Sequence, residues 1–329
     1  MANIAIIGAG SWGSALAMVL HDNGHAVTLW SLEEEHIAEL KRTGENPRFL
    51  PGVKLPASLN YTADLAEAAR DKAMLVLAVP SHAMRPVTKS LQGLVHKDQL
   101  LLSVAKGFDI ETHARMSELI AATFPANPVA VLSGPSHAEE VSRRVPTAIV
   151  AASGDELIAQ QVQAYFNNDY MRVYVNSDVI GVELGGALKN IVALASGICY
   201  GLGGGDNTEA AILTRGLKEI VRLGSKLGAK ETTFYGLSGM GDLVVTCGSR
   251  HSRNRTAGIM LGKGKKLADI QAEMGMVVEG INAARIAHVL AEEHGVEMPI
   301  TEAIYRVLYQ DYPISRLAVD LMRRDVKPE

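Results

Sequence analysis

Three glycines near the start of the chain have the spacing that a dinucleotide phosphate requires. Gly8, Gly10 and Gly13 form the pattern G-x-G-x-x-G directly after an isoleucine-rich apolar run at residues 3–7. The first glycine permits a tight turn, the second lets the backbone approach a pyrophosphate, and the third lets a helix pack close to the sheet. The N-terminus of the following helix presents free N–H groups to phosphate. The sequence therefore predicts a cofactor-binding turn, and a strand-to-helix turn without a ligand is the alternative.

Lys189 is the candidate for moving a proton. Reduction of a carbonyl by a nicotinamide needs a proton at the developing alkoxide and groups that hold the substrate over the ring. The segment around Lys189 is apolar on nearly every side, so a helix there should be buried, and a buried lysine is costly without a partner or a task. Gly185 and Gly186 lie one turn earlier and are expected to clear space above the lysine. A salt-bridged or snorkelling lysine is the structural alternative.

Two further charged residues suit the same chemistry. Burial and nearby positive charge make a lysine a better base at neutral pH, and Lys106 is expected to supply part of that charge. Asp242 is expected to hydrogen-bond Lys189 or a substrate hydroxyl, although by itself it would be an ordinary turn aspartate.

A helix start rich in arginine indicates a phosphate site. Ser252 is a suitable N-cap for a helix that begins at Arg253, and Arg250, His251 and Arg255 surround it. The helix dipole and the guanidinium charges both favour a phosphate-bearing substrate at this position. The alternative is a solvated basic loop on the surface.

The elements that must position these residues change character halfway along the chain. Strands are predicted at 3–7, 26–30, 74–79, 99–104, 129–132, 147–151 and 171–175. Helices are predicted between them, at 12–23, 33–43, 62–70, 83–95, 111–123 and 155–167. The later part shows only helical patterns, at 179–200, 208–227, 231–235, 253–261, 267–274, 279–294 and 300–309. We therefore expect an α/β protein: a Rossmann-type, parallel-sheet domain over 1–177, then an all-helical domain over 178–329.

Ligands of such a sheet bind at the carboxyl ends of the strands, where the strand order reverses. The short polar loops at 80–82, 106–107 and 133–136 follow predicted strands and are the candidate ligand loops. The second predicted strand ends at Ser31, where an NAD site usually has an acidic residue. A neutral Ser31 does not repel a 2′-phosphate, but no arginine adjoins it to bind one. NADPH is therefore the expected cofactor, with NADH possible.

Bulk properties exclude several classes of partner. A formal net charge of −4 offers no electrostatic reason to bind nucleic acid or an anionic membrane surface. Apolar runs such as 74–79 are of strand length, so no membrane span is expected. Cys199 and Cys247 make neither a disulfide framework nor a metal site, and no signal peptide is recognisable. A cytoplasmic protein without a metal is predicted.

Taken together, these stretches resemble the bacterial-type NAD(P)-dependent sn-glycerol-3-phosphate dehydrogenases. The matching pieces follow one another along nearly the whole chain: 8–13, 79–82, 105–107, 133–136, 185–190, 214–216, 241–247, 252–255 and 278–280. Two positions depart from the family pattern. His137 stands where an aromatic such as Phe is more usual, and Ser31-Leu32 lacks the arginine often found in NADP-preferring members.

The resemblance implies reversible reduction of dihydroxyacetone phosphate to sn-glycerol 3-phosphate, a precursor of phospholipids, by a homodimer with a 6-phosphogluconate dehydrogenase-like C-terminal domain. It implies that Lys189 exchanges the proton at the carbon-2 oxygen. The implied substrate contacts are Lys106, Gly134, Ser136, Lys189, Asp242, Ser252, Arg253 and Asn254. The implied cofactor contacts are Ser11, Trp12, Lys106, Ala138, Arg253, Val277 and Glu279, beside the glycine turn.

Two other functions fit the fold and the glycine pattern. One is a related two-domain reductase of the ketopantoate or 6-phosphogluconate type. The capped helix at Ser252 favours a small phosphorylated substrate and speaks against ketopantoate. The other is a non-catalytic dinucleotide sensor, which would need neither Lys189 nor Asp242.

Overall fold

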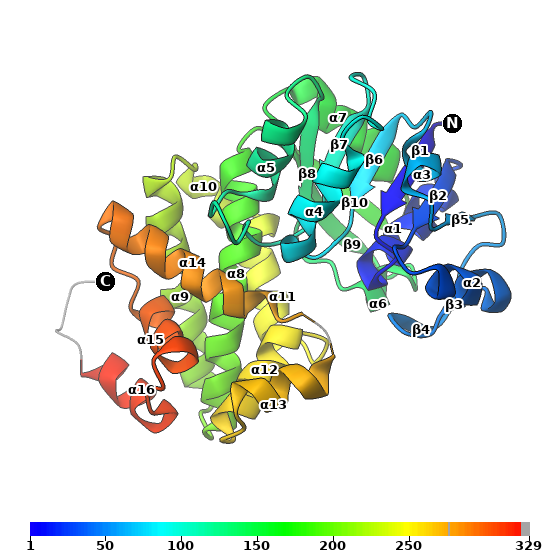
Figure 1. Ribbon diagram of the computed structural model, residues 1–329. Helices are drawn as coiled ribbons and strands as arrows, with labels where there is room; N and C mark the ends of the chain where they lie inside the picture. Colours follow the sequence, from blue (N-terminus) through cyan, green and yellow to red (C-terminus); the bar gives the residue numbers. More distant parts are fainter. Residues whose placement is uncertain (276, 324–329) are drawn as a thin grey trace. The chain divides into compact units, whose positions relative to one another are not determined.

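The computed structural model describes residues 1–275 and 277–323, and the chain forms two compact units, Met1–Glu183 and Leu184–Glu329 (Figure 1). The predicted division after residue 177 lies a little earlier along the chain. The observed division falls inside one long helix, α8 (Val179–Gly201), which begins in the first unit and continues into the second.

The first unit is built on an eight-stranded sheet in the order β10-β9-β8-β7-β6-β1-β2-β5. Its strands are β1 (Asn3–Ile7), β2 (Ala26–Trp30), β5 (Asn60–Thr62), β6 (Met74–Leu77), β7 (Leu100–Ser103), β8 (Val129–Ser133), β9 (Thr147–Ala152) and β10 (Met171–Asn176). From β1 the chain adds β2 and β5 on one side, then returns to add β6 on the other. The strand order therefore reverses between β1 and β6, beside the glycine turn, as the Rossmann-type prediction requires.

One part of the predicted parallel sheet is wrong: β8 and β9 are antiparallel, with Val131 opposite Ala152 and Ser133 opposite Val150. The connection between them contains only the four-residue helix α6 (Ala138–Val141). A parallel neighbour needs a crossover, usually a full helix, that returns the chain to the opposite edge of the sheet. Such a helix, α7 (Glu156–Phe166), follows β9, and β9 and β10 are accordingly parallel.

The sequence patterns also missed three short strands. β3 (Glu45–Asn46) and β4 (Leu50–Lys54) form an antiparallel hairpin, and β5 joins the main sheet beside β2. Each is short, and β4 carries a Pro-Gly pair that reads as a turn.

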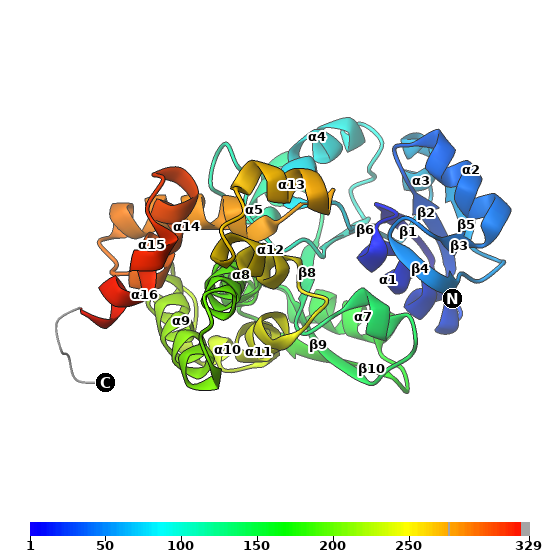
Figure 2. The ribbon, with the colours of Figure 1, turned by 90° about the horizontal axis from the view of Figure 1, so that it is seen from below.

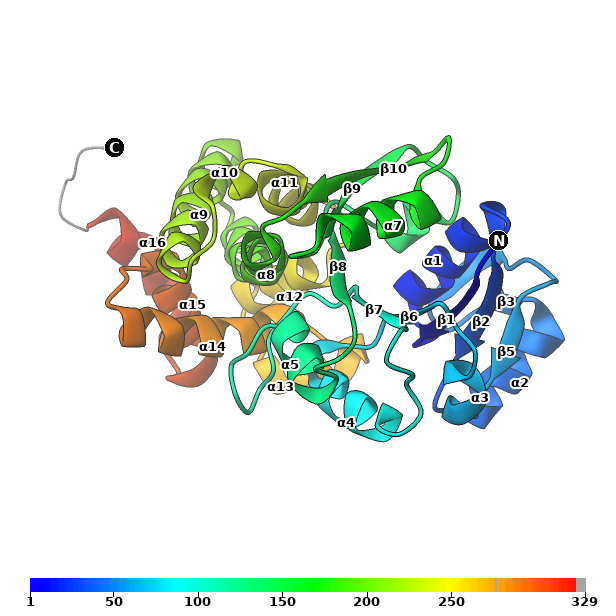
Figure 3. The ribbon, with the colours of Figure 1, turned by 90° about the horizontal axis from the view of Figure 1, so that it is seen from above.

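Helices cover both faces of the sheet, as Figure 3 shows from above. Ile4 and Ile6 of β1 face a core completed by α1 (Ser11–Asp22), α6 and α7, whereas Ala5 and Ile7 face α3 (Leu65–Ala69), α4 (Ser81–Leu91) and α5 (Met116–Thr123). All these β1 residues have no exposed surface. Burial on both faces explains why the strand reads as a continuous apolar run. Helix α2 (Glu34–Thr43) packs beside β3 and β5.

The second unit is helical over the residues that the structure describes. Its helices after α8 are α9 (Asp206–Lys226), α10 (Glu231–Phe234), the π-helix η1 (Leu237–Gly241), α11 (Asp242–Gly248), α12 (Arg253–Gly262), α13 (Leu267–Met274), α14 (Glu279–His294), α15 (Pro299–Tyr309) and α16 (Ile314–Met322). The predicted helices are confirmed, and η1, α11 and α16 were missed. Figure 2 shows α8 nearly end-on among the other helices of this unit.

Helix α8 is the central element of this unit. Within the described part of the chain it is the one helix that length and composition would allow to cross a membrane. However, 89% of its most apolar window is buried inside the structure, which is the position of a core helix. Its apolar character therefore reflects packing by its neighbours on every side, as the sequence predicted.

The glycine turn depends on one close backbone approach. A Cβ added at Gly13 would lie 2.0 Å from the carbonyl oxygen of Gly8, whereas a Cβ at Gly10 would meet nothing within 4 Å. Gly8 itself has a φ of 124°, which side chains rarely adopt. Gly13 is thus required for folding of the turn, and Gly10 leaves open space in front of it.

We expect Gly13→Ala to lower the melting temperature by about 5 °C or more, because overpacking at this contact costs on the order of 3 kcal/mol. Gly10→Ala is the matched control: it adds the same methyl group three residues away, and it should leave the melting temperature unchanged. Thermal unfolding followed by circular dichroism would measure both. Equal melting temperatures for the two variants would contradict this account of the turn.

Candidate active site

The glycine turn places the start of α1 at the reversal in the sheet. The Gly8 N–H donates to the carbonyl of Trp30 at the end of β2 (3.1 Å), and Gly10 is the N-cap of α1 without a side-chain cap. Ser11, Trp12 and Gly13 form the first turn, whose N–H groups have no acceptor within the helix. Trp12 is partly buried against the core of the sheet. The open space at Gly10 and the uncapped helix start fit a dinucleotide pyrophosphate.

A buried chain of hydrogen bonds holds this turn from behind. The side-chain amide of Asn46, which is fully buried, donates to the carbonyl of Ala9 and to the hydroxyl of Ser14, both at 2.8 Å. His36 bonds the carbonyl oxygen of that amide and, through its other ring nitrogen, the hydroxyl of Ser31, both at 3.1 Å. Ser31 is therefore linked to the glycine turn. Sequence reasoning missed Asn46 and His36, since neither lies in a recognisable motif.

An arginine lies near the end of β2 after all. Arg48, from the connection between β3 and β4, forms an ion pair with Glu33 at 2.6 Å, two residues past Ser31. No arginine is next to Ser31 in the sequence, but the hairpin of β3 and β4 brings the Arg48 guanidinium to the loop that follows β2. Both side chains are more than half exposed.

Lys106, Gly134 and Ser136 form one cluster beyond the ends of β7 and β8. The Lys106 ammonium donates to the Gly134 carbonyl at 2.8 Å and to the Ser136 hydroxyl at 3.1 Å. The Ser136 hydroxyl also donates to the Gly134 carbonyl at 2.9 Å. Ala138 follows at the start of α6 and is buried. The structure thus brings Lys106 together with two predicted substrate contacts that lie 28 and 30 residues further along the sequence.

An ion pair braces the loop that carries Lys106. Asp109, which is 3% exposed, accepts hydrogen bonds from the guanidinium of Arg85 and from the amide and hydroxyl of Thr112. Burial raises the pKa of Asp109, but the bonds from Arg85 and Thr112 outweigh it and bring the pKa to about 2. The predicted helix at 111–123 begins only at Met116, because this braced loop occupies the preceding residues.

The start of α8 is anchored in the same unit. The buried carboxylate of Glu183 accepts hydrogen bonds from the Ser117 amide (2.8 Å), the Ser117 hydroxyl and the guanidinium of Arg115. Burial raises the pKa of Glu183, and the bonds from Arg115 and Ser117 oppose that shift. Helix α8 therefore begins from a fixed contact with α5.

In the second unit, Lys189 is buried beside Asp242, with 5% and 1% of their surfaces exposed. The Lys189 ammonium donates to the Asp242 carboxylate and, at 2.6 Å, to the hydroxyl of Thr246 one turn further along α11. Asp242 compensates the charge of the buried ammonium. The sequence predicted that Asp242 would bond either Lys189 or a substrate hydroxyl, and the structure shows the bond to Lys189. Thr246 was not recognised as a partner, although it lies in a stretch that carries the family resemblance.

Gly185, one turn before Lys189, makes room for another segment of the backbone. A Cβ on Gly185 would lie 2.6 Å from the carbonyl oxygen of Ser238, which belongs to η1. The missing side chain therefore makes room for the backbone of η1 rather than for a ligand above the lysine. This close approach brings Asp242, the residue directly after η1, to the lysine.

The capped helix start is confirmed. The Ser252 hydroxyl accepts from the Arg255 amide at 3.2 Å and caps α12. Arg255 turns away to stack on Tyr200 at 4.8 Å, whereas Arg253 is exposed in the first turn. Arg250 is also exposed but precedes the cap, so Arg253 is the exposed arginine that lies within the first turn of α12.

Asn254 joins three elements of the helical unit. Its amide nitrogen donates to the side-chain oxygen of Asn190 on α8, and its oxygen accepts from the Gly280 amide at the start of α14, both at 2.9 Å. Two predicted cofactor contacts lie just before it: Glu279 directly precedes Gly280, and Val277 lies three residues before it. Asn254 thus links the capped start of α12 to the residue beside Lys189 and to the segment predicted to contact the cofactor.

The predicted site residues fall into two groups, one in each unit. The first unit holds the glycine turn with the Lys106 cluster, and the second holds the Lys189 pair with the capped α12. Residues 1–275 and 277–323 contain no group of three or more His, Cys, Asp or Glu side chains arranged for a metal ion.

Comparison with known proteins gives this arrangement a family. The profiles described as the N-terminus and the C-terminus of NAD-dependent glycerol-3-phosphate dehydrogenase match residues 3–159 and 178–318. Glycerol-3-phosphate dehydrogenase (NAD(P)+) of Exiguobacterium sp. is 51% identical over 100% of this chain and 97% of its own length. The crystal structure of glycerol-3-phosphate dehydrogenase from Coxiella burnetii matches with a TM-score of 0.95 and 39% identity, over 98% of this chain and 99% of that one.

A ketopantoate reductase from Ralstonia eutropha shares the fold at a TM-score of 0.63, but only 15% of the residues are identical, over 96% of this chain and 99% of that one. This likeness is one of fold alone. The two profiles follow one another along the chain, and a relative half identical to it spans its whole length: the chain belongs to the NAD-dependent glycerol-3-phosphate dehydrogenase family.

Proposed function

We propose that this chain catalyses the reversible reduction of dihydroxyacetone phosphate to sn-glycerol 3-phosphate with NADPH, and with NADH as a second cofactor. Relatives at about half identity are named as glycerol-3-phosphate dehydrogenases that use NAD(P)+. The observation that carries the proposal is the buried Lys189 on α8, which is bonded to Asp242 and Thr246. The next residue on α8, Asn190, is bonded to Asn254 at the capped start of α12. A proton donor and a phosphate site are thereby joined in one unit.

Lys189 is the proposed proton carrier. Bound NAD(P)H supplies the hydride that reaches carbon 2 of the substrate. The ammonium of Lys189 donates a proton to the carbon-2 oxygen, which completes the alcohol, and the neutral amine accepts that proton back in the oxidation. Asp242 and Thr246 hold the amine in one orientation through both directions.

The remaining roles follow from charge and hydrogen-bonding capacity. Ser252, Arg253 and Asn254 bind the substrate phosphate at the start of α12, where the cap, the guanidinium and the helix dipole act together. Lys106, Gly134 and Ser136 contribute further substrate contacts from the first unit. The cofactor contacts are proposed for the glycine turn with Ser11 and Trp12, and for Lys106, Ala138, Arg253, Val277 and Glu279.

We also propose that the protein is a cytoplasmic homodimer. The family resemblance supports the dimer, and two free cysteines, Cys199 and Cys247, suit a reducing compartment. Light scattering coupled to size-exclusion chromatography would give the mass of the assembly.

We expect Lys189→Met to lower turnover by about a hundredfold or more, since a positioned acid–base group contributes at least that much. Cofactor binding, measured by fluorescence titration with NADPH, should stay within about twofold. The matched control is Lys218→Met, an exposed lysine on α9 that should retain full turnover.

Removing Lys189 alone leaves the Asp242 carboxylate buried without its counter-charge, which costs on the order of 3–5 kcal/mol. The double variant Lys189→Met/Asp242→Asn removes both charges, so it keeps the test valid if the single variant unfolds. Turnover close to the wild-type rate in either folded variant would remove Lys189 from the mechanism.

For the phosphate site we expect Arg253→Ala to raise KM for dihydroxyacetone phosphate by about tenfold to a hundredfold, as for loss of a charge-assisted hydrogen bond. The rate with unphosphorylated dihydroxyacetone should not change. Lys263→Ala, which removes an exposed charge from the opposite end of α12, serves as the control and should change neither value. If Arg253→Ala affects both substrates equally, the α12 turn does not recognise the phosphate.

Arg48 gives a test of cofactor preference. In Arg48→Ala the Glu33 carboxylate loses its ion-pair partner and is left to repel a 2′-phosphate. We expect the ratio of kcat/KM for NADPH to that for NADH to fall about tenfold. The companion variant Glu33→Gln keeps the arginine and should preserve or increase the ratio. An unchanged ratio in Arg48→Ala would exclude Arg48 from cofactor selection.

A further inference from the structure

The helical unit contains a cavity of about 520 Å³ that none of the predicted site residues lines. It lies between α8, α9, α15 and α16, and its walls are mainly aliphatic, with Ala195, Ile198, Ile212, Ile300 and Leu317 among the lining residues. Its volume is in the range of small-molecule sites. Ile198 follows Lys189 by nine residues on α8, about 14 Å along the helix axis. The cavity is therefore separate from the proposed proton carrier.

Two arginines from α9, Arg215 and Arg222, bring positive charge to this aliphatic cavity. They are two helical turns apart and so lie on one side of the helix. Arg222 donates to the main-chain carbonyl of Glu297. Arg215 has no hydrogen-bond or ion-pair partner among the residues that the structure describes. A guanidinium without a partner beside apolar walls is suited to an anionic group on an apolar ligand.

The carboxyl group that lies between the two arginines on α9 is held by donors from α15. Glu219 is 3% exposed and accepts hydrogen bonds from the Ile300 amide (2.6 Å) and from the Thr301 amide and hydroxyl, both 3.1 Å. Its oxygens are thus committed to the start of α15. Burial raises the pKa of Glu219 to about 7, against the lowering effect of these bonds and of Arg222. A second carboxylate, Glu297, also lines the cavity. Arg222, Glu219 and Glu297 each have contacts within the protein, which leaves the Arg215 guanidinium to interact with a ligand.

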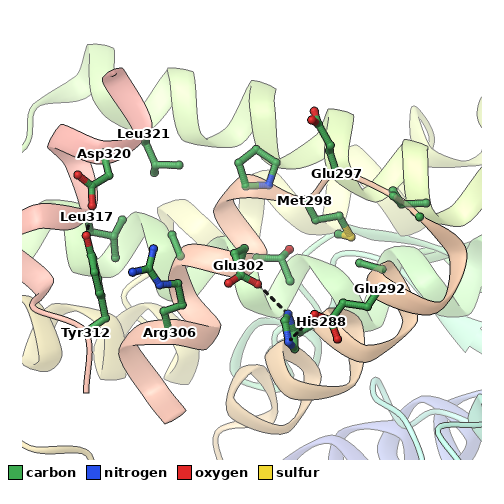
Figure 4. A pocket seen from close by; sticks show the side chains of 16 residues that line it. His288, Glu292, Glu297, Met298, Glu302, Arg306, Tyr312, Leu317, Asp320 and Leu321 are labelled. Atoms are coloured by element: carbon green, nitrogen blue, oxygen red, sulfur yellow. Dashed lines mark hydrogen bonds and ion pairs between the residues drawn. The ribbon is translucent and has the colours of Figure 1, made fainter. Parts of the chain in front are cut away.

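A neighbouring cavity of about 450 Å³ has no such arginine, because the guanidinium in its lining is engaged (Figure 4). Its ionisable side chains are engaged with one another: His288 with Glu302 at 2.7 Å, and Tyr312 with Asp320. The Arg306 guanidinium stacks on the Tyr312 ring at 3.8 Å. The contrast singles out the aliphatic cavity as the one with charge to offer.

We propose that the aliphatic cavity binds a single-chain amphipathic anion, with its alkyl chain against the aliphatic walls and its phosphate or carboxylate head group on Arg215. The apolar lining provides the affinity for the chain, since burial of each methylene contributes about 0.8 kcal/mol. The unpartnered guanidinium provides the selectivity for an anionic head group.

Calorimetric titration with three probes tests this assignment: decyl phosphate, decanol and inorganic phosphate. Decyl phosphate should bind at least tenfold more tightly than either decanol or inorganic phosphate, with a negative heat-capacity change from apolar burial. Equal binding of decanol and decyl phosphate would overturn the role of Arg215. An absence of decyl phosphate binding would overturn the site.

Cys199 reports where the probe binds. It lines the cavity and is partly exposed, whereas Cys247 is buried, and the chain has no other cysteine. Bound decyl phosphate should slow alkylation of Cys199 by iodoacetamide by at least fivefold, as followed by mass spectrometry of the peptide. Binding without protection of Cys199 would place the probe elsewhere and contradict the proposal.

Matched variants separate the chain and head-group contacts. Ala211→Trp fills the cavity from an exposed position on α9 and should weaken decyl phosphate binding at least tenfold, whereas Ala210→Trp, next to it but outside the lining, should not. Arg215→Met should weaken decyl phosphate tenfold and leave decanol unchanged, with Lys218→Met as the charge control. Equal effects within either pair of variants would refute the assignment. None of these four residues belongs to the proposed catalytic machinery, so turnover should persist in all variants.

Discussion

A charged ammonium inside an apolar helix must have an opposite charge beside it, and this requirement organises the helical unit. Lys189 is on the most buried helix of that unit, so its partner has to arrive from another segment. The π-helical turn η1 supplies the approach, and Gly185 supplies the space, because any side chain there would meet the carbonyl of Ser238. The π-helical turn η1 is thus explained by the ion pair between Lys189 and Asp242, which it makes possible. π-helical turns are often found at functional sites for this kind of reason.

The two units meet the needs of their ligands by different physical means. In the first, the proposed pyrophosphate site is made by the backbone: a glycine turn, an open helix start and a buried network from Asn46 hold N–H groups in a fixed place. In the second, the proposed site is made by side chains: Arg253 and Lys189 carry the charge, and Asn254 joins α12 to α8 and α14. A dinucleotide needs close backbone approach, whereas a small phosphorylated ketone needs concentrated charge and a movable proton.

Much of this could be read from the sequence, and the failures have physical causes. The strand β1, the Ser252 cap and the glycine turn could be predicted, because each depends on residues that are close together in the sequence. The antiparallel β9 was missed because strand direction depends on the length of the connection and not on the strand. Asn46, Arg48 and Thr246 were missed because each acts on a partner distant in sequence. No local pattern records such a contact.

Helix α8 is fixed at two points, since Glu183 is bonded to Arg115 and Ser117, and Lys189 is bonded to Asp242 and Thr246. Along a helix, adding or deleting one residue turns everything beyond it by about 100° and shifts it by about 1.5 Å. Between these two points the side chains other than at Gly185 can vary within the limits of packing, but the number of residues cannot change. During divergence of related chains, the stretch from 184 to 188 should therefore reject insertions and deletions, and it should accept substitutions except at Gly185.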